Sequence, residues 1–442
     1  MKNLNHFLSR SLRWIGFEAI SYQVVLLLHQ LALFKVTDYK TYGLIGATFS
    51  LVYLIVSIAD LGLESSISPF FVQVSRSKRA FRAFFMLQLI PNILFTGFVF
   101  VAIIFLNSRF RLLPLPLYMT LVLYALVLTE TVKKTLRTAI HLAFLNRQAA
   151  YIEVGTILVY VSTIWLCYSF GVGVGLPLVF IPMLITSLIS TVYMGYALYR
   201  FSHTLPDADF IQVSKKRVMK SRFCNFLNQI SHTVFSSNFL VPFFALQFGF
   251  VQAGIFKFIS HIAYGVTSIV RKTFGLTSDA LLAQAKYMSS ETKKTIFSRI
   301  TQRLHHVLYG IVIFLIINHG KLFTHYCAVD SVAWPLIYLF LFICLSENLF
   351  IAYEKLYITQ EKTWRLLAFN ALAMAFTYGV VTAVSGMSQL FVLLAIISVR
   401  VLMFVLLGLV SFYTWDIKPE WKLNPSYVAI ALCAALGFFV FF

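Results

Sequence analysis

The chain has 442 residues, of which 60% are hydrophobic and only 12% are charged, and this composition excludes a soluble enzyme. A formal net charge of +20 would indicate nucleic-acid binding in a soluble protein. Here the basic residues lie mostly between long apolar stretches, so we expect a lipid bilayer and no nucleic acid as the partner.

Apolar stretches long enough to cross a bilayer follow one another along almost the whole chain. They begin at Trp14, Gly43, Phe84, Leu115, Tyr151, Val174, Phe226, Ala253, Leu304, Val332, Leu366, Leu390 and Ser426. The sequence therefore predicts an all-α polytopic membrane protein with about 12 or 13 transmembrane helices. The last stretch, within 416–442, is predicted as an extra C-terminal helix, with an interfacial helix as the alternative.

The basic residues predict the orientation of these spans. With a cytoplasmic N-terminus, most of the 36 Lys and Arg residues fall in inward loops, as the positive-inside rule requires. The segment 201–222 is the central basic loop. The loop from Lys133 to Arg147 is expected to be another inward loop. Glu130 and Glu153, at the edges of their spans, are expected to make only local or interfacial contacts.

The chain appears to repeat itself at an offset of 211 residues. This offset aligns the second span with the eighth, pairing Gly43 with Gly254, Tyr53 with Tyr264, Ser57 with Ser268 and Asp60 with Arg271. We predict an N-terminal six-helix lobe in 1–200, a basic cytoplasmic linker in 201–222 and a C-terminal six-helix lobe in 223–415. A parallel pseudo-two-fold repeat around a central cavity would relate the lobes.

Polar residues form a line on each of the two aligned spans, at steps of three and four residues. The second span carries Ser50, Tyr53, Ser57, Asp60, Glu64 and Ser68, and the eighth carries Lys257, His261, Tyr264, Ser268 and Arg271. We expect both faces to border one cavity, because polar groups inside a membrane usually face water or a partner. The alternative is that the hydroxyl groups join helices and that Asp60 and Arg271 form a static ion pair.

Other ionisable residues also lie inside spans. Arg400 is near the middle of the twelfth span, where we favour an anion contact over an ion pair with a carboxylate. Glu18 and His29 are three helical turns apart on one face of the first span. We expect Glu18, Asp60 and Arg271 to form an inner gate. The candidate gating or ion-coupling residues are Glu18, Asp60, His29 and Glu347.

Several catalytic signatures are absent from the sequence. It contains no phosphate-binding G-x-x-x-x-G-K-[ST] motif, no H-E-x-x-H pair and no C-x-x-C pair among its five cysteines. We therefore expect no enzyme activity, no catalytic residues, no metal and no cofactor.

The second span resembles the second helix of polysaccharide flippases. The resemblance is carried by Tyr42 and Gly43 through Ser57, by Asp60, Leu61, Gly62 and Leu63, and by Ser65 to Pro69. The stretch from Ala352 to Arg365 is similar to the connection that follows the tenth helix of these transporters. The chain thus resembles Wzx-type polysaccharide or O-antigen flippases of the multidrug/oligosaccharidyl-lipid/polysaccharide exporter superfamily.

This resemblance implies a V-shaped bundle in the inner membrane of a bacterium. The bundle would flip an undecaprenyl-diphosphate-linked oligosaccharide, with H⁺ or Na⁺ as coupling ion and a polysaccharide polymerase and chain-length regulator as partners. Cationic groups would neutralise the diphosphate and aromatic groups would hold the sugars. The candidate substrate-binding residues are Lys257, Arg271, Arg400, His261, Tyr53 and Tyr264.

Two other classes of function remain open. An ion-coupled drug or metabolite exporter of the same superfamily is the second interpretation, and it would favour a pocket lined by carboxylates. An integral-membrane glycosyltransferase or polymerase is the third.

Overall fold

The computed structural model describes residues 2–110, 116–207, 214–233, 236–285, 291–308 with gaps at 292–293, 303 and 305, 351–383 except 361, and scattered positions from 399 to 410. Contacts divide the chain into two compact units, Met1–Lys257 and Phe258–Phe442, and each is described by itself. The predicted spans that begin at Val332 and Ser426 lie outside the described residues, as do Glu347, Arg400 and most of the span that begins at Leu390.

Every element in the described residues is a helix, which confirms the all-α prediction. The helices are α1 (Lys2–Val36), α2 (Tyr39–Ala59), α3 (Leu63–Val74), α4 (Lys78–Phe110), α5 (Leu117–Leu142), α6 (Asn146–Ser169), α7 (Leu176–Thr204), α8 (Lys215–Thr233), α9 (Ser237–Ala285), α12 (Ile351–Thr359) and α13 (Thr363–Ala383). Within the described ranges, five helical segments are long and apolar enough to cross a membrane: Arg13–Val36, Tyr39–Ala59, Lys78–Val101, Asn146–Ser169 and Leu176–Thr204.

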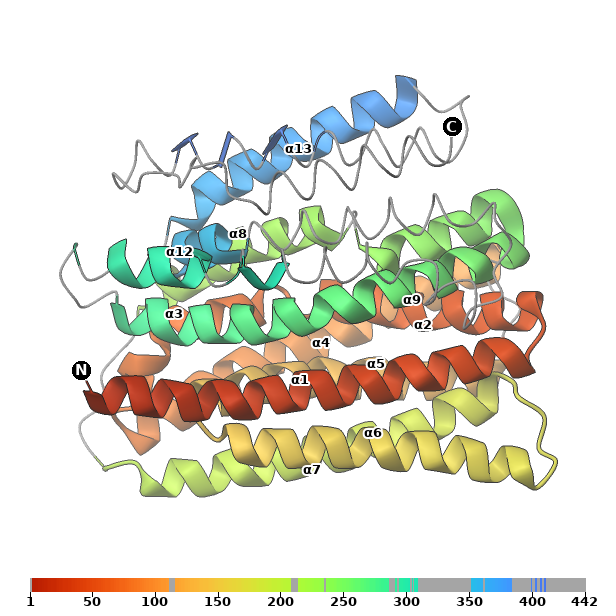
Figure 1. The fold of residues 1–442 in the computed structure, drawn as a ribbon, viewed down its shortest axis with the longest axis horizontal. Helices are drawn as coiled ribbons and strands as arrows, with labels where there is room; N and C mark the ends of the chain where they lie inside the picture. The colour runs from red at the N-terminus through yellow and green to blue at the C-terminus, as the bar shows by residue number, and fades with distance from the viewer. Residues whose placement is uncertain are drawn as a thin grey trace. The chain divides into compact units, whose positions relative to one another are not determined.

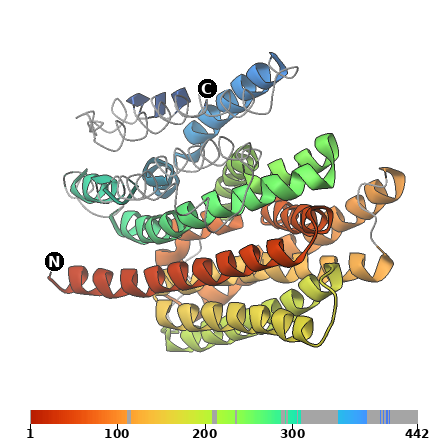
Figure 2. The same cartoon turned by 45° about the vertical axis from the view of Figure 1, so that its right-hand side comes forward.

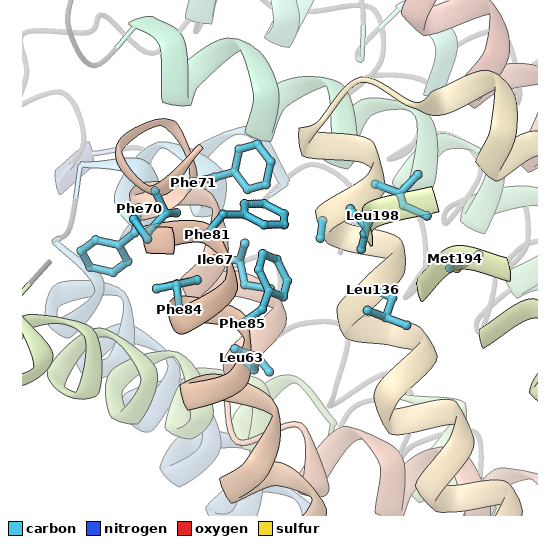
Figure 3. Packing of buried hydrophobic residues seen from close by; sticks show 14 of the residues in the cluster. Leu63, Ile67, Phe70, Phe71, Phe81, Phe84, Phe85, Leu136, Met194 and Leu198 are labelled. Atoms are coloured by element: carbon cyan, nitrogen blue, oxygen red, sulfur yellow. The ribbon is translucent and has the colours of Figure 1, made fainter. Parts of the chain in front are cut away.

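Four helices of the first unit, α1, α5, α6 and α7, lie side by side in Figures 1 and 2. Helix α5 packs most extensively against α7, and α6 packs against both α1 and α7. Two apolar clusters hold α5 in place. One gathers Met119, Leu123 and Leu126 of α5 with side chains of α2, α6 and α7. The other, shown in Figure 3, joins Leu136 of α5 to phenylalanines of α3 and α4.

The second predicted span is not one continuous helix, contrary to the prediction. Helix α2 ends at Ala59 and α3 begins at Leu63, so Glu64 and Ser68 do not continue the polar line of α2. The break has a steric cause. Leu61 and Gly62 adopt positive φ angles of 48° and 69°, and a Cβ on Gly62 would lie 2.5 Å from the carbonyl oxygen of Arg222 in α8. Only glycine permits this approach of two backbones at a positive φ.

The seventh predicted span, which begins at Phe226, takes in the end of α8 and the part of α9 before Gly249, and the eighth lies in the part of α9 after it. Helix α8 begins at Lys215, inside the segment predicted as linker. Within α9, Gly249 has φ of 84° and ψ of 170°, so the helix is interrupted there, four residues before the predicted start at Ala253. In the second unit, α12 and α13 share an apolar cluster with Phe297 and Ile300.

Gly62 offers a test of this packing. We expect Gly62→Ala to lower the midpoint of thermal unfolding by several degrees, because it adds a clash with α8 to the roughly 1–2 kcal/mol cost of a positive φ. Gly171→Ala is the matched control, since Gly171 has φ of 83° but no atom within 4 Å of a Cβ. Thermal unfolding of the detergent-solubilised protein measures both. Equal shifts would show that α8 does not depend on this contact.

Candidate functional site

A belt of ionisable side chains lies on the C-terminal half of α5. Apart from the adjacent pair Lys133 and Lys134, the neighbouring members Glu130, Lys133, Lys134, Arg137 and His141 are three or four residues apart, so they share one side of the helix. The prediction that Lys133 begins an inward loop is wrong. The basic residues belong to the helix itself, and the side chains of Lys133 and Arg137 are only 13% and 24% exposed.

Carboxylates from three elements meet the lysines of this belt. Lys133 Nζ lies 3.7 Å from Glu130 Oε1 and 3.5 Å from Glu153 Oε1 of α6. Lys134 Nζ lies 3.7 Å from Oδ2 of Asp60, the residue that follows α2. The interfacial prediction for Glu153 is therefore wrong, since this side chain is buried and faces α5.

Glu18 of α1 joins the belt through Arg137 and His141. Arg137 Nη2 donates to Glu18 Oε1 over 2.6 Å, and His141 Nε2 lies 3.4 Å from Glu18 Oε2. The other ring nitrogen, Nδ1, lies 2.7 Å from Oδ1 of Asn146. An amide oxygen only accepts, so Nδ1 carries a proton and Nε2 is the nitrogen that gains or loses one.

Four carboxylates, Glu18, Asp60, Glu130 and Glu153, lie beside three cations of α5, Lys133, Lys134 and Arg137. A histidine beside a carboxylate can gain or lose a proton, so Glu18 and His141 are the candidate proton-binding pair of the belt.

Arg222 of α8 is a buried cation that the sequence analysis missed, because it was counted with the basic linker. Its guanidinium donates to Oε1 of Gln88 over 2.7 Å and also to Oδ1 of Asn92. Asn92 Nδ2 in turn donates to the carbonyl oxygen of Asp60 over 3.0 Å. Gln88 and Asn92 stand four residues apart in an apolar span, a spacing that indicates a polar face.

Lys257 is the predicted substrate-binding residue that the structure describes most fully. Its side chain lies across α2 and is buried, with the residue only 3% exposed. The ammonium donates to Ser50 Oγ over 2.7 Å and lies 5.1 Å from the ring centre of Phe49. The ring of Tyr53 is 4.9 Å from the same ring. Two candidate substrate-binding residues, Lys257 and Tyr53, thus share one aromatic neighbour.

The other predicted residues are not all brought together. His29 lies eleven residues after Glu18 on α1 and is buried, and Trp165 Nε1 donates to its Nδ1 over 3.2 Å. His261 and Arg271 are half-buried on the part of α9 that belongs to the second unit. The side chain of Tyr264 lies outside the described residues. Within the first unit, the gate candidates Glu18 and Asp60 contact Arg137 and Lys134.

No protein-family model and no curated protein matches the sequence. The fold, however, matches solved transporters over nearly the whole chain. An outward-facing multidrug-resistance MATE-family transporter of the MOP superfamily has a TM-score of 0.68 at 11% identity, over 94% of this chain and 97% of its own.

Two further solved structures are similar. The Vibrio cholerae MATE transporter VcmN, in a mutant form, gives a TM-score of 0.67 at 10% identity, over 96% of this chain and 99% of its own. A MOP-superfamily transporter from Pyrococcus furiosus gives a TM-score of 0.62 at 11% sequence identity, over 93% of this chain and 97% of its own. The chain is an all-α multi-pass membrane protein. Its fold is that of the MATE transporters of the MOP superfamily.

The Glu18–Arg137 pair gives a prediction about stability. Arg137→Gln removes the cation beside the buried Glu18 carboxylate, so we expect the free energy of unfolding to fall by up to about 3 kcal/mol. Adding Glu18→Gln should restore part of this free energy. Thermal unfolding of the single and double variants measures both changes. Arg147→Gln is the control, because Arg147 is exposed over Trp14 and should cost less than about 1 kcal/mol. A double variant no more stable than Arg137→Gln would contradict the pairing.

Proposed function

We propose that this protein flips a polyprenyl-diphosphate-linked oligosaccharide, such as an O-antigen or capsule repeat unit, across the inner membrane of a bacterium. The MATE fold supports a transporter that works by alternating access. The observation that carries the substrate class is the buried ammonium of Lys257. This ammonium donates to Ser50 and lies over the ring of Phe49, and a cation in a low-dielectric interior attracts an anionic group such as a diphosphate.

The distribution of carboxylates supports an anionic cargo. Glu18, Asp60, Glu130 and Glu153 each lie within 3.7 Å of a basic side chain of α5. A pocket for a cationic drug would need carboxylates that face the ligand instead. For the Pyrococcus furiosus transporter, a reversed polarity of the binding pocket suggests a different function. We draw the same kind of inference from Lys257.

An ion-coupled drug or metabolite exporter is the second candidate, because it would have the same fold. The buried carboxylates of the α5 belt would favour a drug exporter only if they released their basic partners and bound a cationic substrate instead. A glycosyltransferase or polymerase ranks third, since the solved structures of similar fold reported above are transporters.

We also propose H⁺ as the coupling ion, with Glu18 and His141 as the pair that holds it. His141 Nε2 lies 3.4 Å from Glu18 Oε2, so the two groups can share a proton. Asn146 fixes the imidazole tautomer so that Nε2 faces the carboxylate. The proton pair is formed by residues of α1 and α5, whereas Lys257 belongs to α9, so substitutions can test the two sites separately.

The substrate proposal is tested by following the lipid-linked oligosaccharide in each leaflet. In bacterial cells that lack the protein, we expect the oligosaccharide to accumulate on the cytoplasmic leaflet. Display of surface polysaccharide should fall in parallel. Unchanged distribution between the leaflets, together with export of a cationic dye by the purified protein, would favour the drug exporter.

Lys257 provides the sharper variant. We expect Lys257→Gln to reduce flipping at least about tenfold, because a charged hydrogen bond to phosphate is lost. Lys257→Arg should keep partial activity, since it preserves the charge but not the compact ammonium. Lys40→Gln, at an exposed position near the start of α2, is the control and should flip normally. Full activity of Lys257→Gln in proteoliposomes would refute the assignment.

Removing either member of the Glu18–His141 pair should abolish the coupling of transport to a pH gradient but should leave substrate binding intact. In proteoliposomes, a pH gradient should stimulate transport by the wild type but not by His141→Gln or Glu18→Gln. His203→Gln removes an exposed histidine at the end of α7 and should behave as the wild type. A His141→Gln variant that responds normally to the gradient would exclude this pair as the proton site.

A further inference from the structure

The end of α7 is fixed against the start of α4. The backbone N–H of Lys78 donates to the carbonyl oxygen of Pro206 over 3.1 Å. The rings of Phe81 and Phe201 meet edge to face, with their centres 5.7 Å apart. Phe81 belongs to the apolar cluster of Figure 3, which also includes Leu198 of α7. Exposed side chains at these two helix ends therefore have fixed neighbours.

A cluster of hydrogen-bond donors lies on the exposed surface of these helix ends. The exposed guanidinium of Arg82 lies 5.3 Å from the ring centre of Tyr199. Its Nη2 donates to Nε2 of His203 over 2.9 Å, and its Nε donates to Ser202 Oγ over 3.4 Å. Lys78 stands one turn before Arg82, and its charge acts on the ring of His203. We call Lys78, Arg82, Tyr199 and His203 the Arg82 patch.

The donors of the Arg82 patch suit an anion that offers several oxygen acceptors. A guanidinium only donates, so Nε2 of His203 accepts and the neutral ring carries its proton on Nδ1. The described residues supply no acceptor for that N–H or for the ammonium of Lys78. The oxygens of a phosphate diester only accept, so they are complementary to this set of donors.

The Arg82 patch also differs from the α5 belt in its charge balance. Each cation of the belt lies within 3.7 Å of a carboxylate, but no ion pair among the described residues involves Lys78 or Arg82. Asp207, which directly follows Pro206, pairs with neither of them in the described structure. An anion from outside the chain can therefore neutralise these two charges.

An apolar stripe begins one helical turn after Arg82. It consists of four side chains of α4 that are each more than half exposed: Met86, Ile90, Leu94 and Phe98. Side chains four residues apart share one face of a helix, so the stripe continues the face that carries Arg82. The stripe lies inside one of the segments that can cross a membrane, with Arg82 near the start of that segment. The stripe is thus placed beside acyl chains, and Arg82 beside headgroups.

We propose that the Arg82 patch and the apolar stripe together bind one anionic glycerophospholipid. Its phosphate lies against Lys78 and Arg82, and one acyl chain follows the stripe along α4. The predicted cytoplasmic N-terminus places this site in the inner leaflet, where basic side chains attract anionic headgroups. The site does not depend on what the protein transports.

The charge of the site predicts which headgroup it prefers. Phosphatidylglycerol carries one negative charge and no amine. Phosphatidylcholine carries the same phosphate, but its quaternary ammonium would lie close to Lys78 and Arg82, and like charges repel. The site should therefore select phosphatidylglycerol over phosphatidylcholine.

Native mass spectrometry of the detergent-solubilised protein tests this site through the first lipid bound. We expect dioleoyl phosphatidylglycerol to bind about tenfold more tightly than dioleoyl phosphatidylcholine. Replacing both cations, Lys78→Gln with Arg82→Gln, should weaken phosphatidylglycerol binding at least about tenfold, because charged hydrogen bonds to phosphate are lost. Arg13→Gln is the control, since it removes an exposed cation on the same predicted membrane side, and it should change the affinity less than about twofold.

Two further measurements separate a lipid site from simple charge attraction. Arg82→Lys keeps the charge but loses the planar fork over Tyr199, so its affinity for phosphatidylglycerol should be intermediate. Dihexanoyl phosphatidylglycerol, whose short chains cannot follow the stripe, should bind more weakly than the dioleoyl lipid. Equal affinities of the wild type and the double variant would overturn the proposal. Inorganic phosphate bound as tightly as the lipid would also overturn it.

The unfolding midpoints of the variants without added lipid provide the check on folding. They should equal that of the wild type, because Arg82 is exposed and Lys78 is half-buried without an ion pair in the described structure.

Discussion

The high cost of an uncompensated charge in a low-dielectric interior organises the first unit. Each cation of the α5 belt is met by a carboxylate from α1, α6, the end of α2 or α5 itself. Because removing one member would leave its partner buried and uncompensated, these helices are held in one relative arrangement. The apolar clusters on either side of the belt then fill the remaining space along α5.

The sequence was sufficient to predict the class of fold and the approximate positions of the first six spans. Their boundaries follow from hydropathy, which depends only on local composition. The belt was missed for a physical reason. Lys133, Lys134 and Arg137 resemble loop residues in a charge count, and only the packing of α1 and α6 shows that carboxylates surround them. Their spacing with Glu130 and His141 was the available signal.

Other features depended on contacts between distant segments. The break at Gly62 comes from the approach of α8, and the burial of Arg222 comes from amides on α4. Neither can be inferred from local periodicity. The offset of 211 residues is different, because it pairs Gly43 with Gly254 in the sequence and the backbones of these two glycines lie against each other. Lys257, chosen because a buried charge is costly, indeed lies buried against α2.

The packing of Gly46 against Lys257 also restricts which residues these two positions can hold together. The lysine stem occupies the space into which a side chain at position 46 would grow. A larger residue at position 46 therefore requires the stem of residue 257 to move or to become shorter. Substitutions at the two positions are coupled, although 211 residues separate them in the chain.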